Sequence, residues 1–447
     1  MGGPMTNYGF VIDNRKCIGC HACTVACKSE HDVAIGVNRT HVKYIETGTY
    51  PNSGREFSVH RCNHCEDAPC VSICPTIALF TREDGIVDFD SDRCIGCKSC
   101  MQACPYDALY IDPNTSTAAK CNYCAHRVEN SYEPACVIVC PTEAIISGDL
   151  DDPESNIAMI ISEQTVTVRK PDSGAKPNVF YVDTSEEMLD PLAAPPESTG
   201  VWTDQEGGVG HFASQAQALL HAHGYGDRMK DVDEENARRV YDAPDKGVLW
   251  GWEVSTYIWT KAIAAGTYLA AMLYWLAFGG DISGVLLPVL GISLGFLALT
   301  GFLLVYDLDR PERFLYVLLR PNWESWLVKG AYILGAYGAI LTASLAVVWF
   351  DLGENWLTWL AYAGMPLALL TGVYTAWLLN QAVAREAWTS KWLAPQFAVE
   401  TLLAGVCVLV LLSEEMLVWV IVAVVALAVL AAHQRRTIRE PQLVPLS

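Results

Sequence analysis

The chain has 447 residues, of which 51% are hydrophobic and 18% are charged, and its formal net charge is −20. This length allows two or three domains. The negative charge argues against nucleic acid as a partner, because the phosphates would be repelled. Charged residues lie mostly before Asp245 and apolar runs lie after it. The sequence therefore predicts a soluble half followed by a membrane half.

The soluble half alternates short strands with cysteine-rich loops. Strand-forming residues occur at 8–13, 42–45, 57–60, 85–89 and 109–112, and helix-compatible residues follow the first cysteines at 22–30. Prolines beside the cysteines prevent the loops from continuing as helices. The repeated order of strand, loop and short helix predicts tandem ferredoxin-like modules, which belong to the α+β class.

Sixteen of the seventeen cysteines form four groups of four. Two groups have the spacing C-x2-C-x2-C-x3-C, and the other two lengthen the second gap. Three thiolates on one tight loop can reach different irons of a cubane, while the fourth ligates the neighbouring cluster. The pattern therefore predicts four [4Fe–4S] clusters. In chain order the groups are Cys17, Cys20, Cys23 and Cys27; Cys62, Cys65, Cys70 and Cys74; Cys94, Cys97, Cys100 and Cys104; and Cys121, Cys124, Cys136 and Cys140.

Three other uses of cysteine explain this pattern less well. A disulfide framework would fit an even number of cysteines, but residues 1–11 lack the apolar core of a secretory signal. Zinc sites use C-x2-C pairs, but they do not require the repeated longer run. Residues 17–21 match the C-x-x-C-H of covalent haem attachment, yet Cys23 and Cys27 continue the ferredoxin spacing.

Residues 183–249 are rich in proline, glycine and acidic residues, which predicts a linker with one short helix at 212–223. Its histidines, His211, His221 and His223, lack helical i,i+4 pairing and a nearby cysteine, so surface or interface positions fit them better than a metal site. The predicted domains are 1–182, a four-cluster ferredoxin-like domain; 183–249, the linker; 250–435, a membrane domain; and 436–447, a C-terminal tail.

From Trp250 onward the sequence repeats apolar runs of about 20 residues, the length that crosses a bilayer as a helix. Tryptophan and tyrosine gather at the ends of these runs, as interfacial anchors do. The sequence therefore predicts an all-α bundle. Its six predicted spans are 256–278, 284–306, 327–350, 356–379, 392–412 and 416–432.

Loop charge predicts the orientation of this bundle. Arginine and lysine follow the second, fourth and sixth predicted spans, whereas the other loops carry aspartate and glutamate. Basic loops face the cytoplasm, and no twin-arginine motif lies near the N-terminus. We therefore expect a multi-pass protein of the inner cell membrane with its iron–sulfur domain on the cytoplasmic face.

The membrane half contains no histidine from residue 250 through 432, so no histidine-ligated haem is expected there. Electrons would then pass from a cluster directly to a lipid-soluble carrier, menaquinone or ubiquinone. Lys261 and Glu400 lie inside predicted spans at similar depth. Two roles fit them: an ion pair that locks helices together, or proton delivery to quinone. The other residues predicted near the quinone are Tyr257, Glu253, Asp307 and Arg310.

Three stretches of the soluble half are distinctive: CNHCEDAPC at 62–70, PACVIVCPT at 134–142 and KPDSGAKPNVFY at 170–181. With these stretches, residues 8–182 resemble the four-cluster ferredoxin subunits of the molybdopterin oxidoreductases. It implies four interlocked ligand sets and no three-iron cluster. The implied sets are Cys17, Cys20, Cys23 and Cys140; Cys27, Cys121, Cys124 and Cys136; Cys62, Cys65, Cys70 and Cys104; and Cys74, Cys94, Cys97 and Cys100.

The membrane half contains the stretches DLDRPERF at 307–314, LLRPNWESW at 318–326 and YTAWLL at 374–379. With these stretches, residues 250–412 resemble the quinone-reactive membrane subunit of the polysulfide reductase (NrfD-type) family. That family usually has about eight spans, each about 20 residues long. This copy, with six predicted spans, is therefore expected to be shortened at its C-terminus.

Together these patterns predict an electron-transfer and membrane-anchor subunit of a respiratory oxidoreductase complex. The resemblance implies a separate catalytic subunit of the molybdopterin type, since the chain carries no such domain itself. Three alternatives remain: a self-standing ferredoxin:quinone oxidoreductase, a hydrogenase electron-transfer subunit, and a structural or proton-translocating anchor that binds no quinone. The chain is thus expected to transfer electrons between sites, with chemistry of its own only at the quinone.

Overall fold

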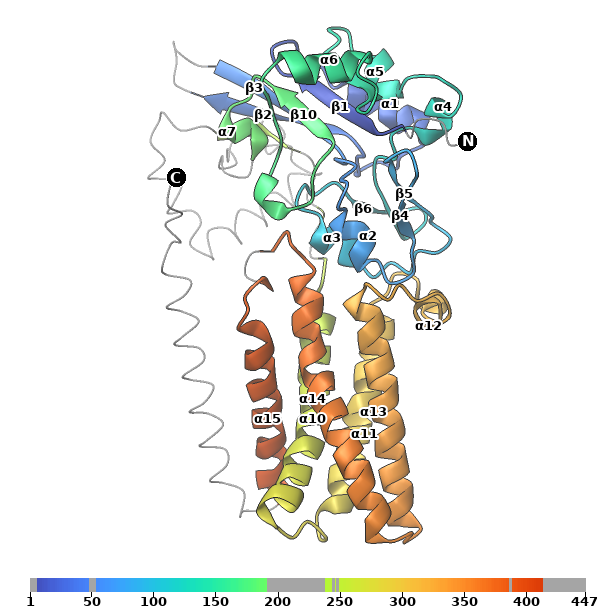
Figure 1. The fold of residues 1–447 in the computed structure, drawn as a ribbon, viewed down its shortest axis with the longest axis vertical. Coiled ribbons are helices and arrows are strands. Elements are labelled where there is room, and N and C mark those ends of the chain that lie inside the picture. The colour runs from blue at the N-terminus through green and yellow to red at the C-terminus, as the bar shows by residue number, and fades with distance from the viewer. Residues whose placement is uncertain are drawn as a thin grey trace, which may run out of the picture. The chain divides into compact units, whose positions relative to one another are not determined.

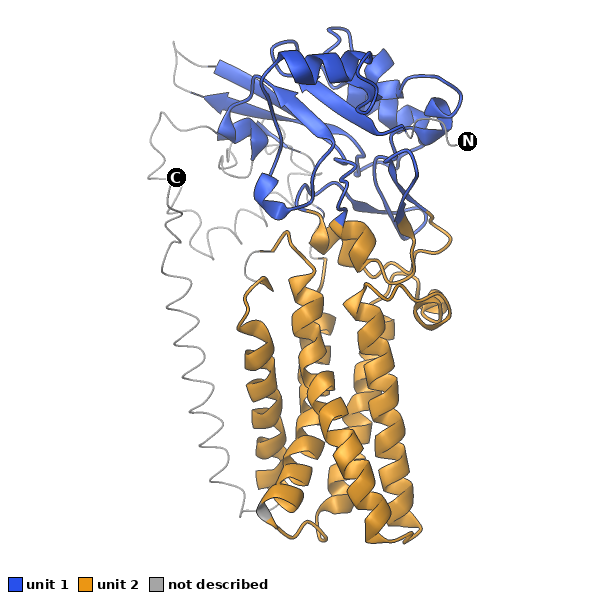
Figure 2. Cartoon of the chain, in the orientation of Figure 1, with its two compact units in different colours: residues 1–68, 80–89, 105–247 blue, residues 69–79, 90–104, 248–447 orange. Residues whose placement is uncertain are grey.

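The computed structural model describes residues 6–47, 54–190, 238–242, 246, 249–385 and 388–412. The chain forms two compact units (Figure 2). Unit 1 comprises residues 1–68, 80–89 and 105–247, and unit 2 comprises residues 69–79, 90–104 and 248–447. Two segments from the cysteine-rich half therefore group with the long helices, a division that differs from the predicted domain boundaries.

A four-stranded sheet in the order β8-β1-β10-β9 forms part of unit 1, and its central strands β1 and β10 are labelled in Figure 1. Its strands are β1 (Tyr8–Asp13), β8 (Ile145–Asp149), β9 (Val166–Thr167) and β10 (Val179–Val182). β1 pairs with β10 in parallel and with β8 in antiparallel register. Phe10 and Ile12 face a core that includes Cys23 and Cys136, whereas Val11 faces a second core with Ile157 of α6 (Asn156–Glu163). The alternation of a strand thus places one face of β1 against the cysteines.

A three-stranded antiparallel sheet in the order β11-β2-β3 also belongs to unit 1. It joins β2 (His41–Thr47), β3 (Gly54–His60) and β11 (Arg238–Tyr241). The last strand and the short helix α7 (Glu186–Leu189) come from the predicted linker. The helix expected at 212–223 and the tail at 436–447 lie outside the described residues.

Short helices carry or adjoin many of the cysteines, and two small hairpins lie between the cysteine groups in the sequence. The short helices beside cysteines are α1 (Ala22–Glu30), α4 (Ala125–Val128) and α5 (Ala135–Ile138) in unit 1, and α2 (Pro69–Ile73) and α3 (Ser99–Ala103) in unit 2. β4 (Leu79–Thr81) pairs with β5 (Val87–Phe89), and β6 (Tyr110–Asp112) pairs with β7 (Thr117–Ala119). The predicted ferredoxin-like succession of strands, cysteine loops and short helices is thus present.

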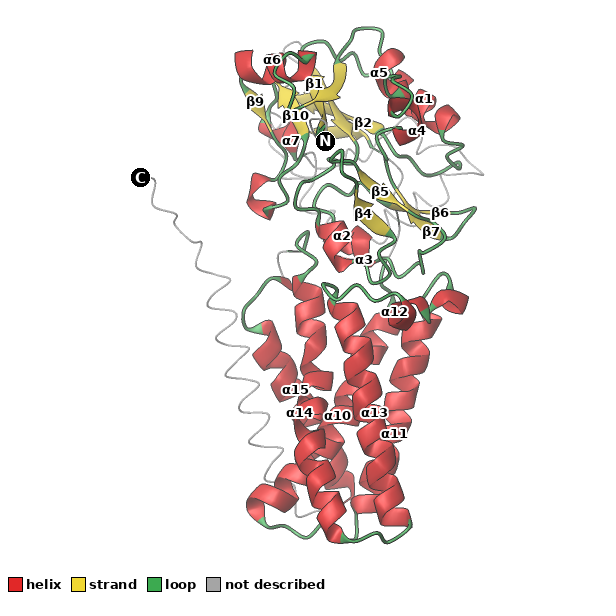
Figure 3. Ribbon diagram, turned by 45° about the vertical axis from the view of Figure 1, so that its right-hand side comes forward, coloured by secondary structure: helices red, strands yellow, loops and turns green. Residues whose placement is uncertain are grey.

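Five long helices make up most of unit 2, and they run alongside one another in Figure 3. They are α10 (Trp252–Phe278), α11 (Leu286–Tyr306), α13 (Trp326–Trp349), α14 (Glu354–Asn380) and α15 (Leu393–Leu412). Among the described residues, the last four of these are long and apolar enough to cross a membrane. α10, which carries Glu253 and Lys261, is not one of the four, and the predicted sixth span at 416–432 lies outside the described residues.

α10 packs against α11, α14 and α15. At its crossing with α15, Gly266 and Gly405 face each other so closely that a Cβ atom on either would overlap the other backbone. Small residues let helix backbones approach in an apolar surrounding, where van der Waals packing replaces the hydrophobic driving force. This crossing therefore holds α10 inside the bundle.

Candidate functional site

The two groups with identical cysteine spacing have the same loop conformation. In the first, Gly19 and His21 have φ angles of 67° and 57°; in the third, Gly96 and Lys98 have φ angles of 70° and 59°. The left-handed region favours glycine, and the residue that precedes the helix turns the chain into α1 or α3. The sequence repeat is therefore also a structural repeat, as expected of tandem cluster-binding loops.

In unit 1, cysteine thiols of the first and fourth groups are neighbours of one another. Burial raises the pKa of the Cys17 thiol, and the nearby Cys140 and Cys20 thiols add to the rise. Burial raises the pKa of Cys27 to about 12, and the Cys136 and Cys124 thiols again add to it. Thiols in such surroundings are held as thiolates only by a cation, which bound iron would supply.

Unit 2 contains a third convergence of thiols. Burial raises the pKa of Cys97 to about 12, with further contributions from Cys74 and Cys94. Cys100 lies among the same thiols and its pKa is also raised, first by burial. These four cysteines are one of the ligand sets that the resemblance implies. Of the remaining implied set, Cys62 and Cys65 belong to unit 1, while Cys70 and Cys104 belong to unit 2.

Within the described part of the chain, no three His, Cys, Asp or Glu side chains converge closely enough to hold a single metal ion. A cubane does not need that convergence, because each of its four irons is bound by a different cysteine. The cysteines present, mostly buried and gathered in sets of neighbours, therefore fit the wider spacing of a cluster.

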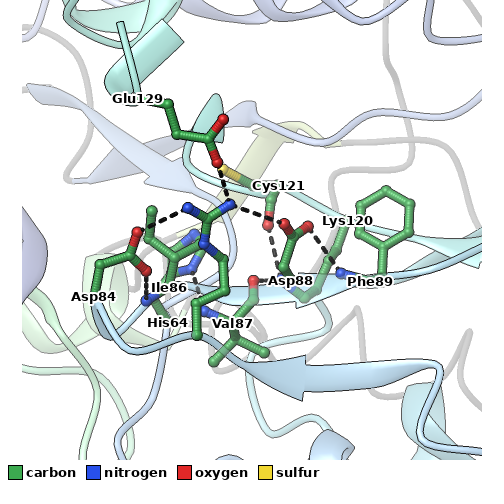
Figure 4. Close-up of polar contacts among 10 residues, drawn as sticks. His64, Asp84, Ile86, Val87, Asp88, Phe89, Lys120, Cys121 and Glu129 are labelled. Carbon is green, nitrogen blue, oxygen red and sulfur yellow. Dashed lines mark hydrogen bonds and ion pairs between the residues drawn. The ribbon is translucent and has the colours of Figure 1, made fainter. Parts of the chain in front are cut away.

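Two fully buried cations lie among the cysteines of unit 1. Lys120 donates to the carbonyl oxygens of Val87 and Cys121, and the Val87 amide donates to Nδ1 of His64 (Figure 4). Arg61 is 1% exposed, and its Nη1 donates to Sγ of Cys136 over 3.2 Å. Buried positive charge is costly alone, so its placement beside thiols favours the binding of an anionic group there.

The loop that carries Cys97 is fixed to the segment that follows α11, within unit 2. The amides of Asp309 and Arg310 donate to the carbonyl oxygens of Gly96 and Ile95 over 3.5 and 3.2 Å. Lys98 forms an ion pair with Asp309 at 3.0 Å. A Cβ atom at Gly96 would lie 2.6 Å from Cβ of Asp309, so only glycine allows this approach.

A cavity of about 270 Å³ lies beside this loop. Its walls come from α10, α11, α12 (Tyr316–Leu319), α13 and α14, together with the cysteine loop itself. The lining is mainly aliphatic, with a few polar groups, which is typical of pockets for small apolar ligands. The residues that bring polarity or aromatic rings to it are Cys97, Ser99, Trp250, Tyr257, Asp307, Phe314 and Tyr374.

Two of the six residues predicted near the quinone, Tyr257 and Asp307, line this cavity. Lys261 is fully buried beside it, where Nζ donates to Oγ1 of Thr375 and lies 4.4 Å from the centroid of the Tyr374 ring. Burial raises the pKa of Asp307 to about 6; Lys98 opposes the rise, and Glu253 adds to it.

The other predicted members have different surroundings. Glu400 accepts a hydrogen bond from Nε2 of Gln396 at 2.8 Å, and among the described residues no ion pair joins it to Lys261. Arg310 forms an ion pair with Glu312 at 3.3 Å. Glu253 lies in the first turn of α10 and does not line the cavity, but its charge adds to the rise in the pKa of Asp307.

Trp250 and Tyr374 contribute to the site in ways that the sequence analysis did not predict. Trp250 was expected to be an interfacial anchor, but its Nε1 donates to the carbonyl oxygen of Cys97 over 3.1 Å and its ring stacks on Trp388. Tyr374 was noted only as part of a family motif. Neither position stands out in one sequence, because aromatic residues are common at both ends of membrane helices.

Comparison with known proteins identifies both halves of the chain. Residues 55–150 match the family described as a 4Fe-4S dicluster domain, and residues 243–420 match the family described as polysulphide reductase, NrfD. The predicted iron–sulfur electron-transfer half and NrfD-type membrane half are thereby confirmed.

Three curated relatives support the assignment of the iron–sulfur half. A tetrathionate reductase subunit of Salmonella typhimurium is 43% identical over 196 residues, 43% of this chain and 78% of that protein. A polysulfide reductase subunit of Wolinella succinogenes is 43% identical over 178 residues, 39% of this chain and 93% of that protein. The arsenate respiratory reductase iron–sulfur subunit ArrB of a Shewanella species is 34% identical over 222 residues, 39% of this chain and 95% of that protein. The protein therefore belongs to the family of reductase iron–sulfur subunits that includes these tetrathionate and polysulfide reductase subunits, and it also carries an NrfD membrane domain.

Proposed function

We propose that this chain carries electrons between a separate catalytic subunit and membrane quinone through four [4Fe–4S] clusters. The observation that carries the proposal is the apolar cavity beside Cys97 in unit 2. A ligand in that cavity would lie against a proposed cluster ligand on one side and membrane-type helices on the other. Menaquinone and ubiquinone have the required character, because each combines an apolar tail with a redox-active head group.

The sixteen cysteines would hold the clusters in the four interlocked sets given above. The neighbours of Cys17 and Cys27 support the first two sets, and the neighbours of Cys97 support the set in unit 2. Bound clusters would supply one-electron redox chemistry. The chain itself would fix their ligands, exclude water from buried thiolates and, at the cavity, position the quinone.

The polar groups of the cavity suit a carrier that gains protons together with electrons. Reduction of a quinone to a quinol consumes two protons, and Asp307, with its pKa near 6, can hold one at near-neutral pH. The phenol of Tyr257 lines the same cavity. Lys261 lies behind it, in contact with Tyr374. We assign Asp307 to proton delivery and Tyr257 to orientation of the head group.

The catalytic partner and the membrane orientation are parts of the same proposal. The relatives are named as subunits of tetrathionate, polysulfide and arsenate reductases, which favours a separate reductase subunit, and we propose one of the molybdopterin type. Loop charge favours a cytoplasmic iron–sulfur domain in the inner membrane, with α10 and residues 416–432 completing six spans.

Gly301 offers a way to test quinone binding without a steric clash. It lines the cavity, and a Cβ atom there would meet nothing within 4 Å. We expect Gly301→Leu to narrow the cavity and slow reoxidation of the reduced clusters by a short-chain quinone at least tenfold. Gly291→Leu is the matched control, because it also has open space on α11 but does not line the cavity. Equal reoxidation rates in both variants and the native chain would show that the quinone does not bind in this cavity.

A further inference from the structure

Arg61 is a buried cation whose side chain directly contacts a cysteine of unit 1. Nη1 donates to Sγ of Cys136, whereas Nε and Nη2 are buried without a hydrogen-bond partner. The guanidinium lies over the ring of Phe10, with Cζ 4.5 Å from the ring centroid. Among the described residues no carboxylate forms an ion pair with it. The desolvation cost of this buried charge is therefore not offset by a carboxylate.

The negative groups around Arg61 are thiols of two different proposed clusters. Cys136 and Cys121 belong to one ligand set, and Cys23 belongs to the other. Burial raises the pKa of Cys23 to about 11, and the guanidinium opposes this rise. The guanidinium also opposes the rise in the pKa of Cys27, which belongs to the same ligand set as Cys136 and Cys121. A single fixed positive charge thus faces both sets.

We propose that Arg61 is a positioning residue that raises the reduction potentials of these two clusters together. The inference rests on the cluster ligation proposed above. Each reduction adds one electron, and hence one unit of negative charge, to a cluster, with no bond formed or broken. A fixed cation nearby stabilises the more negative, reduced form. Because Arg61 lies near both sets, it raises both reduction potentials. Both clusters are then more readily reduced, while the difference between their potentials stays small.

Two substitutions separate the charge of Arg61 from its hydrogen bond and shape. Arg61→Gln keeps a donor toward Cys136 but removes the charge, whereas Arg61→Lys keeps the charge but removes the planar fork. Arg82→Gln is the control for loss of a cation in unit 1, because Arg82 is bound instead by the carboxylates of Asp84 and Glu129. The full-length protein in lipid is measured by iron analysis and by potentiometric titration of its electron paramagnetic resonance signals.

In Arg61→Gln we expect the ratio of reduced to oxidised cluster at a fixed potential to fall at least tenfold for two of the four clusters. For a one-electron couple this corresponds to about 59 mV. Arg61→Lys should stay closer to the native values. Loss of two clusters in Arg61→Gln but not in Arg61→Lys would show instead that the charge is needed for cluster assembly, and it would overturn the inference that Arg61 sets their potentials.

Unchanged potentials in Arg61→Gln, an equal shift of all four clusters, or loss of clusters in both variants would overturn the inference. Absence of four cluster signals from the native chain would instead reject the proposed function, so the two failures are distinguishable.

Discussion

Replacement of Asp307 by asparagine tests whether the cavity beside Cys97 delivers protons to a quinone. Asp307 immediately follows α11 and faces Lys98 on the cysteine loop, Glu253 and Tyr257 on α10, and Asp309 on its own segment. Burial raises its pKa from 3.8 to about 6 despite the opposing charge of Lys98. The carboxyl group can therefore exchange a proton in the pH range in which most aspartates stay ionised.

The pKa sets the size of the expected effect. With a pKa of about 6, roughly nine-tenths of Asp307 is protonated at pH 5 and about 1% at pH 8, a change of about ninetyfold. If Asp307 donates the proton, quinone reduction falls as the pH rises through 6, whereas quinol oxidation rises over the same interval. Asp307→Asn should abolish this inflection and lower the rate at pH 6 at least tenfold, because general acid catalysis typically contributes about a hundredfold or more.

The linkage between pKa and stability separates this effect from unfolding. A carboxyl group whose pKa is raised in the folded state destabilises that state as the pH rises from about 4 to 6, and the cost persists above 6. Asparagine removes this cost. The variant is therefore expected to be at least as stable as the native chain at pH 7, which thermal unfolding in lipid would measure.

The assay follows reoxidation of chemically reduced clusters by a short-chain quinone in stopped flow, between pH 5 and 8, without a catalytic subunit. Asp281→Asn is the matched control, since Asp281 precedes α11 and Asp307 follows it. If Asp307→Asn kept both the native rate and the inflection near pH 6, proton delivery through Asp307 would be refuted.

Two further substitutions test the same region. Lys261→Met should lower quinone reduction and leave the cluster spectra intact, because a buried amine that donates a hydrogen bond beside the cavity is lost while methionine fills its volume; unchanged turnover would exclude Lys261 from the mechanism. Gly96→Ala places Cβ 2.6 Å from Cβ of Asp309 at a φ of +70°, with about 1–2 kcal/mol of backbone strain, and should slow cluster reoxidation. Gly19→Ala is its control, since Gly19 instead meets the ring of Phe57; equal slowing by both would contradict the argument.

Patterns within a few residues of sequence predicted the local structure of the soluble half well. β1 occupies 8–13 and α1 occupies 22–30, as predicted, because alternation and helix propensity act between near neighbours. The identical loops at Gly19 and Gly96 follow from identical cysteine spacing. Contacts distant in sequence were harder. β11 arises within the predicted linker because pairing with β2, rather than its own composition, makes it a strand.

The same limit explains the partners of Lys261. Lys261 and Glu400 lie a similar number of residues into their predicted spans, and an ion pair between them was one of the two roles predicted. The structure surrounds Nζ with Thr375, Tyr374 and Phe397 instead. Depth along a helix is set by a rise of about 1.5 Å per residue, but the direction of a side chain depends on helix rotation, which packing against neighbouring helices determines.

The grouping of residues 69–79 and 90–104 with the long helices has a different cause, because these two segments contribute mainly backbone carbonyl oxygens to it. The amide of Arg310 donates to the carbonyl of Ile95, and the amide of Asn322 donates to the carbonyl of Pro75 over 3.1 Å. Every residue type offers a carbonyl and nearly every type offers an amide, so such bonds leave no recognisable choice of side chain. The side chains that donate to these carbonyl oxygens, such as those of Asn322 and Arg313, can be interpreted only once the opposite segment is known. A sequence can therefore specify a cluster loop and a membrane helix separately while giving no sign that the segment beside the helix is bonded to the loop.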